Sequence, residues 1–64
     1  MEAPLQLVTV WRTATEHCEI VWTTIRGYRV RLWVQNRIFI DELMADADTA
    51  ISRAWQLREQ WAGR

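Results

Sequence analysis

The sequence predicts an α+β fold in which a three-stranded antiparallel meander carries one C-terminal helix packed on one face. Two runs rich in β-branched and aromatic residues, 19–25 and 28–34, flank a glycine-containing turn, and a third apolar run begins at Ile38. Apolar residues then recur at helical spacing after Asp46. Because strands joined by short turns pair antiparallel, one sheet is expected, and a single helix can cover only one of its faces.

The chain is short enough to form one small domain, residues 1–64. Folding at this size buries only about 60% of the surface that the unfolded chain exposes, so such domains are often reinforced. Half of the residues are apolar and five are tryptophan, which argues against disorder. Cys18 and His17 are the only residues of their types, so neither an internal disulfide nor a multi-ligand zinc site is expected. A partner chain is the expected reinforcement.

The charges balance overall but are unevenly distributed. Eight arginines accompany eight acidic residues, and the formal net charge is zero. A basic stretch comprises Arg26, Arg29, Arg31 and Arg37, and an acidic stretch comprises Asp41, Glu42, Asp46 and Asp48. No apolar run is long enough to cross a bilayer, and no basic segment precedes an apolar stretch at the N-terminus. A cytoplasmic location without membrane contact is therefore expected.

The N-terminal segment offers a fourth strand. Residues 5–11 are rich in valine and threonine, and alternation separates two sets, Leu5, Leu7, Thr9 and Trp11 from Gln6, Val8 and Val10. The polar stretch 12–16 divides this segment from the next run. Two alternatives remain open for residues 1–16, an additional strand or a flexible segment.

A tight hairpin turn is predicted at Arg26-Gly27, because glycine supplies the positive φ that such a turn needs. A two-residue turn would place Trp22 opposite Arg31, as a cation–π pair, and Ile20 opposite Trp33. Both tryptophans would then lie on the sheet face away from the helix.

The run 28–34 alternates almost without interruption. Its core face would contain Tyr28, Val30, Leu32 and Val34, and its opposite face Arg29, Arg31 and Trp33. A three-residue loop, Gln35-Asn36-Arg37, would keep Ile38 and Ile40 on the core face. In that register, Trp33 would lie opposite Phe39 and Arg31 opposite Asp41.

A helix is predicted between Asp46, which is suited to an N-cap, and Gly63, where a helix would stop. Asp48 would place a second carboxylate near the positive end of the helix. The apolar stripe comprises Ala47, Ala50, Ile51, Ala54, Leu57 and Trp61. Its three alanines would let the helix approach the sheet closely, and Trp55 falls at the edge of the stripe.

The sequence contains no pattern typical of an enzyme, and no catalytic, cofactor-binding or metal-binding residue is predicted. His17 and Cys18 are adjacent, so in a strand they point to opposite faces and cannot act as a base and nucleophile. Helix capping explains Asp46 and Asp48, and the pairing with Arg31 explains Asp41. Two glycines are too few for a phosphate-binding loop.

The candidate site is the sheet face away from the helix. Its candidate interaction residues are Trp22, Arg29, Arg31, Trp33 and Phe39. Such an aromatic patch needs a cover, and three remain open: the N-terminal segment, a second copy or another protein, and single-stranded nucleic acid. Arginine and aromatic residues are enriched in protein interfaces, so a non-enzymatic protein-interaction module, homodimeric through this face, is favoured. The zero net charge weighs against nucleic acid.

The chain resembles known kinds of protein over about two thirds of its length, and two stretches carry the resemblance. Gly-Tyr-Arg-Val-Arg-Leu at 27–32 and Asp-Ala-Asp-Thr-Ala-Ile at 46–51 resemble short bacterial proteins of uncharacterised function. The glycine-aromatic strand start and the acidic, alanine-rich helix entry also resemble the β-β-β-α domain of HicB-type antitoxins. That resemblance implies a protein partner and a regulatory role. The chain lacks the proline-glycine-cysteine segment that precedes the helix in those domains, so no residue role is transferred.

Overall fold

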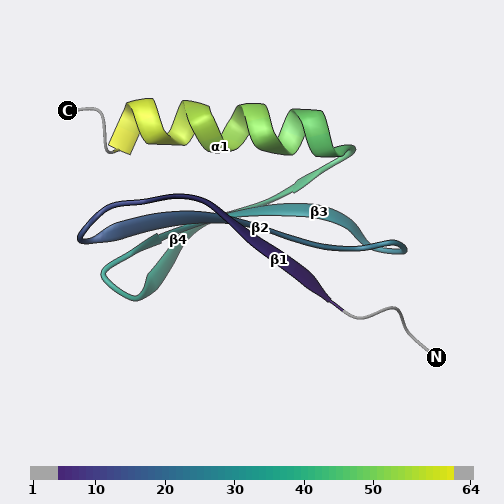
Figure 1. Ribbon diagram of the computed structural model, residues 1–64, viewed down its shortest axis with the longest axis horizontal. Helices are drawn as coiled ribbons and strands as arrows, with labels where there is room; N and C mark the ends of the chain where they lie inside the picture. Colours follow the sequence, from purple (N-terminus) through teal and green to yellow (C-terminus); the bar gives the residue numbers. More distant parts are fainter. Residues whose placement is uncertain (1–4, 62–64) are drawn as a thin grey trace.

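The computed structural model describes residues 5–61 and consists of one antiparallel sheet followed by one helix (Figure 1). The elements are β1 (Gln6–Arg12), β2 (Glu16–Thr23), β3 (Gly27–Val34), β4 (Arg37–Met44) and α1 (Ala47–Trp61). The strands lie in the order β1-β2-β3-β4, so each pairs with its neighbour in the chain. The predicted fold class is confirmed, and the N-terminal segment supplies the fourth strand. Residues 1–4 and Gly63, the predicted helix stop, lie outside the described residues.

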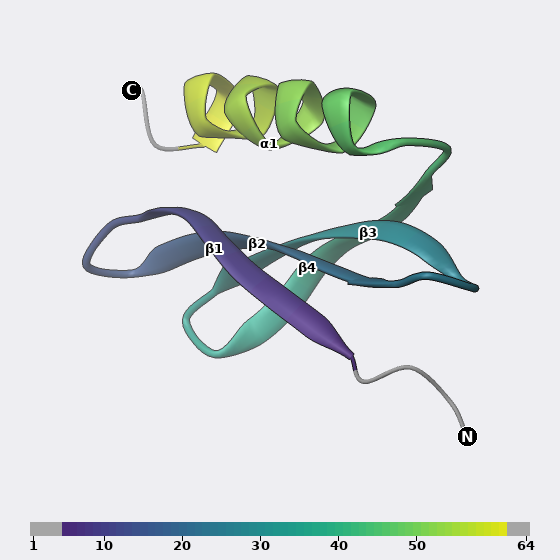
Figure 2. The same cartoon turned by 45° about the vertical axis from the view of Figure 1, so that its right-hand side comes forward.

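The core lies between α1 and one face of the sheet, which we call the core face. The sheet is strongly twisted, and α1 lies across it on one side only (Figures 1 and 2). The buried core comprises Trp11, Cys18, Ile20, Val30, Leu32, Ala50, Ala54 and Leu57. Of the three alanines in the predicted stripe, Ala50 and Ala54 are fully buried against the sheet together with Leu57, whereas Ala47 is partly exposed. No helix in the described part of the chain has the length and apolarity needed to cross a membrane.

The β2–β3 hairpin has a different register from the predicted one. Arg31 lies opposite Glu19 rather than Trp22, a shift of three residues. The turn contains the three residues 24–26. The hydroxyl of Thr23, the last residue of β2, accepts a hydrogen bond from the backbone N–H of Arg26 at 2.9 Å, and Gly27 begins β3 with a φ of 80°. Because an odd shift exchanges the two faces of a strand, Ile20 and Trp22 lie on the core face. The predicted cation–π pair of Trp22 with Arg31 is therefore wrong.

The β3–β4 hairpin reaches the predicted register by a different route. Gln35 and Asn36 have φ values of 50° and 67°, which is typical of a two-residue type I′ turn rather than a three-residue loop. A β-bulge at Phe39 then adds the missing residue. Arg31 consequently lies opposite Asp41, as predicted. Beyond the bulge, Trp33 lies opposite Ile38 instead of Phe39, so the prediction that Ile38 belongs to the core face is wrong.

A second bulge, at Val10 in β1, moves Trp11 to the core face. Trp11 lies opposite the buried Cys18, whereas the simple alternation predicted that it would share a face with Leu7. Its indole Nε1 donates a hydrogen bond to the backbone carbonyl of Ala54 at 2.8 Å. Since β1 joins the sheet edge to edge, the alternative in which the N-terminal segment folds across the opposite face is wrong for residues 6–12.

The start of α1 and its position over β4 are held by side-chain hydrogen bonds. Asp46 accepts a hydrogen bond from the backbone N–H of Thr49 at 2.8 Å, which confirms the predicted N-cap. Arg53 donates from Nε and Nη2 to the two carboxylate oxygens of Glu42 at 2.8 and 3.1 Å. The hydrogen bond from Arg53 lowers the pKa of Glu42. Such a bidentate pair fixes one direction of approach between helix and strand.

We expect Trp11→Phe to destabilise the protein by about 1–3 kcal/mol, because the smaller phenyl ring lacks the N–H that donates to the Ala54 carbonyl and leaves part of a buried site unfilled. Urea unfolding followed by circular dichroism measures the free energy of unfolding. Trp55→Phe is the matched control, since Trp55 is exposed, and should change stability by less than about 0.5 kcal/mol. Equal effects of the two substitutions would contradict a role for the indole hydrogen bond.

We expect the contribution of the Asp46 cap to decline in acid. The backbone hydrogen bond from Thr49 lowers the pKa of Asp46 below its usual 3.8. A lowered pKa gives stability that is complete above the unfolded-state pKa and is lost as the pH falls through the folded-state pKa. The wild type should therefore exceed Asp46→Asn in unfolding free energy at pH 7, and the difference should shrink below about pH 4. A difference that is independent of pH would contradict this assignment.

Candidate interaction surface

The face of the sheet opposite α1, which we call the outer face, is not covered by any element of the described chain (Figure 2). The strand registers place on it Leu7, Thr9, His17, Glu19, Val21, Arg29, Arg31, Trp33, Ile38, Asp41 and Leu43. Charged residues and one tryptophan occupy the middle, and exposed aliphatic residues lie toward both edges. The surface is therefore mixed in character, as protein interfaces are.

Three of the five predicted interaction residues lie together on the outer face. Arg29, Arg31 and Trp33 alternate along β3, so their common face follows from one strand and does not depend on any hairpin. The side chains of Arg29 and Arg31 are 47% and 30% exposed, respectively. Trp33 is half-buried and stacks on His17, with ring centroids 5.7 Å apart and an interplanar angle of 10°.

The other two predicted residues lie elsewhere. Trp22 is on the core face, where it stacks with Tyr28 at a centroid distance of 6.0 Å. Phe39, at the bulge, packs against Trp61, the last residue of α1, with the two ring centroids 5.5 Å apart. Trp22 lies on the core face because the β2–β3 register is shifted, and Phe39 leaves the alternation because of the bulge in β4. The local sequence specifies neither feature. The predicted aromatic patch is thus divided among three places.

The outer face has more exposed donors than exposed acceptors. Asp41 accepts a hydrogen bond from Arg29 at 3.2 Å, and its other oxygen lies 3.5 Å from Nε of Arg31. One carboxylate is therefore shared by two guanidinium groups, each with five N–H donors. Glu19 lies opposite Arg31, but its side chain is nine-tenths buried and lies 3.6 Å from His17. The charge that reaches the surface here is positive.

A shallow hollow lies beside the arginine pair. It has a volume of about 120 Å³ and is lined by residues of β2, β3 and the turn between them, together with Leu5. Val21, which is buried, lies on the same face between the two arginines and the exposed Leu7. An apolar floor next to guanidinium groups can receive a side chain that is apolar along its length and acidic or carbonyl-bearing at its end.

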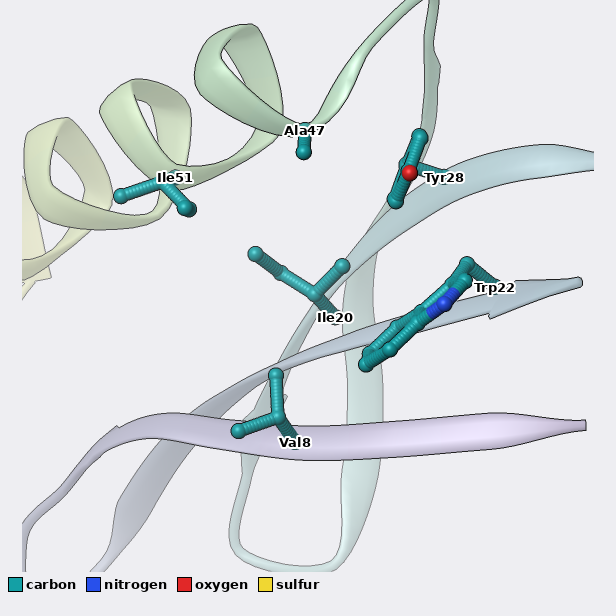
Figure 3. A pocket seen from close by; sticks show the side chains of 6 residues that line it. All are labelled: Val8, Ile20, Trp22, Tyr28, Ala47 and Ile51. Carbon is teal, nitrogen blue, oxygen red and sulfur yellow. The ribbon is translucent and has the colours of Figure 1, made fainter.

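A second surface feature, on the core face, is an apolar groove between β1 and the start of α1 (Figure 3). Its volume is about 210 Å³, and its lining consists of Val8, Ile20, Trp22, Tyr28, Ala47 and Ile51. In Figure 3 these side chains point toward a common space from three strands and the helix. Sequence reasoning missed the groove, because the predicted register assigned Ile20 and Trp22 to the opposite face.

The described residues contain no group of three or more histidine, cysteine, aspartate or glutamate side chains that could hold a metal ion. Cys18 is fully buried on the core face, whereas His17 lies on the outer face. Burial, assisted by the charge of Glu19, raises the pKa of the Cys18 thiol to about 11. Since the thiolate is the nucleophilic form, Cys18 is a structural residue.

Comparison with known proteins adds no assignment, since no family model, curated protein or solved structure matches the chain. The resemblance to HicB-type antitoxins stays a prediction. A function for this chain therefore has to be argued from its own residues and geometry.

We expect Cys18 to resist alkylation in the folded protein. At pH 8, a pKa of about 11 in place of 9.0 lowers the thiolate fraction about a hundredfold, and burial removes access as well. Iodoacetamide labelling followed by mass spectrometry should therefore be at least about a hundredfold slower in buffer than in concentrated urea. Similar rates in the two conditions would contradict the burial of this thiol.

Proposed function

We propose that the protein is a small non-enzymatic interaction module that binds another protein through its outer face. The observation that carries this proposal is the pair of the exposed Arg29 and the partly exposed Arg31, which shares the single carboxylate of Asp41 beside an apolar hollow. Arginine and tryptophan are the residue types most enriched among energetically important interface residues. The aliphatic side chains around them would exclude water from such contacts.

The donor surplus defines the chemistry of the partner. A partner segment with a carboxylate would complete the hydrogen bonding of the two guanidinium groups, and bidentate arginine–carboxylate contacts are both strong and directional. Apolar residues next to that carboxylate would pack on Leu7 and Leu43, which are 56% and 60% exposed. The preferred partner is therefore an acidic segment flanked by apolar residues.

A homodimer that packs two outer faces together is the less favourable form of this function. It would bring the Arg29 and Arg31 pairs of two copies toward each other, and the buried Glu19 could not compensate them without rearrangement. Bringing like charges together in an interface from which water is excluded costs on the order of several kcal/mol. The charge pattern therefore favours a different protein on this face.

Single-stranded nucleic acid is the second candidate, because the stacked His17 and Trp33 rings beside Arg31 resemble the platforms on which bases stack. Phosphate binding, however, depends on a surplus of cations. The formal net charge is zero, and Asp41 lies between the two arginines. Nucleic acid is therefore a less favoured partner than a protein.

We expect a displayed library of random peptides, selected on the immobilised protein, to enrich sequences with an acidic residue next to apolar ones. Affinity for the selected peptides, measured by fluorescence anisotropy, should fall at least tenfold in the double variant Arg29→Gln/Arg31→Gln. The matched control is Arg37→Gln/Arg58→Gln, which removes the same charge from exposed positions of β4 and α1 and should change affinity less than twofold.

Two results would count against the proposal. The first is a set of selected peptides that bind the two double variants equally. The second is salt-sensitive quenching of tryptophan fluorescence by short RNA or DNA oligomers without any peptide selection, which would favour the nucleic-acid candidate.

A further inference from the structure

The two edges of the sheet differ in how well they are protected against pairing with another strand. Edge strands expose unpaired backbone groups, and charged side chains usually prevent unwanted pairing. The edge strand β4 carries Arg37, Asp41 and Glu42. Residues 5–11 at the other edge carry no charge, and the part of β1 before its bulge at Val10 is regular and exposed. β1 is therefore the edge that can accept another strand.

The apolar groove lies along this same edge. Val8 of β1 and Ile51 of α1, which are 46% and 45% exposed, form its two sides. Figure 3 shows Val8 projecting from β1 toward the space beneath Ile51, with the ring of Trp22 beside it. An apolar groove next to an unpaired strand combines backbone hydrogen-bonding groups with a surface that needs a cover.

We propose that two copies of the chain form a symmetric dimer by antiparallel pairing of their β1 strands, which extends the sheet across both molecules. A two-fold axis gives both copies the same contacts and lets an uncharged strand pair with itself without repulsion. This inference does not depend on the proposed function, because it uses the edge of β1 and the core face rather than the arginine pair.

The alternation of side chains limits the possible registers of this pairing, and we place Val8, which lines the groove, on the two-fold axis. Residues that lie directly opposite each other point to the same face of a sheet. Val8 on the two-fold axis lies opposite Val8 of the second copy, and Leu7 lies opposite Thr9 of the second copy. Both core faces then lie on one side of the joint sheet, where the two grooves meet and the two α1 helices lie side by side. A register shifted by one residue would place the helices on opposite sides and leave both grooves open.

The dimer contacts also account for exposed apolar residues that the single chain leaves uncovered. Val8 would pack on its symmetry mate, and Ile51 of each copy would lie over the other copy's groove. Trp55, exposed one turn after Ile51 on α1, lies on the part of the helix that would approach the neighbouring helix. The outer face, with its arginine pair, would remain free in this arrangement.

Sedimentation equilibrium over a dilution series of the full chain tests the dimer, with an expected mass of twice 7.7 kDa at high concentration. Val8→Lys introduces a charge at the axis and should raise the dissociation constant at least tenfold. Ile38→Lys is the matched control, because Ile38 is also 46% exposed and β-branched but lies on the opposite edge strand, and it should leave the dimer unchanged. If Val8→Lys does not fold, Ile51→Glu on the helix surface should produce the same dissociation.

Hydrogen exchange provides an independent measurement on the unmodified chain. The amides of residues 6–9 that point away from β2, every second one, should become more protected as the concentration rises through the dissociation constant, whereas those of β4 should not change. A wild type that stays monomeric at millimolar concentration would overturn the proposal. So would a dimer that Ile38→Lys dissociates and Val8→Lys does not, since that result would place the interface on the outer face or at β4.

Discussion

The close packing of a single narrow helix on a four-stranded sheet is the constraint on which the rest of the structure depends. Ala50 and Ala54 of α1 are fully buried against the core face, where they pack with Cys18, Val30 and Leu32. A helix of this width covers the centre but not the margins. Trp11 of β1 packs at one side of this contact, where its indole donates to the Ala54 carbonyl, and Trp22 of β2 is only partly buried against the core.

The fold class, the helix cap and the face shared by Arg29, Arg31 and Trp33 were predictable, because each depends on periodicity or capping within one segment. The β2–β3 register was not, since a threonine hydroxyl stabilises a longer turn there and only core packing reveals the better face. Both bulges were also unpredictable from alternation. They explain why only part of the candidate site was correct, and why the groove, built from four elements, was missed.

The two bulges have a common effect on the aromatic residues. Each adds one residue to an edge strand and lets an aromatic side chain leave the alternation, Trp11 toward the core and Phe39 toward the end of α1. The inner strands β2 and β3 carry no such insertion relative to each other. The sheet therefore keeps a regular centre, while its margins are adapted to a helix that is too narrow to cover them. The charged network on the outer face sits over the regular part.

The hydrogen bond from Trp11 to Ala54 joins residues near opposite ends of the chain, 43 positions apart. In the described residues, each strand pairs with its neighbour in the chain and can do so early, whereas the core face is covered only after α1 has been synthesised. During translation the core face of the sheet therefore stays exposed to solvent until α1 has left the ribosome. Synthesis of α1 is therefore the step that ends the exposure of the core face to aggregation.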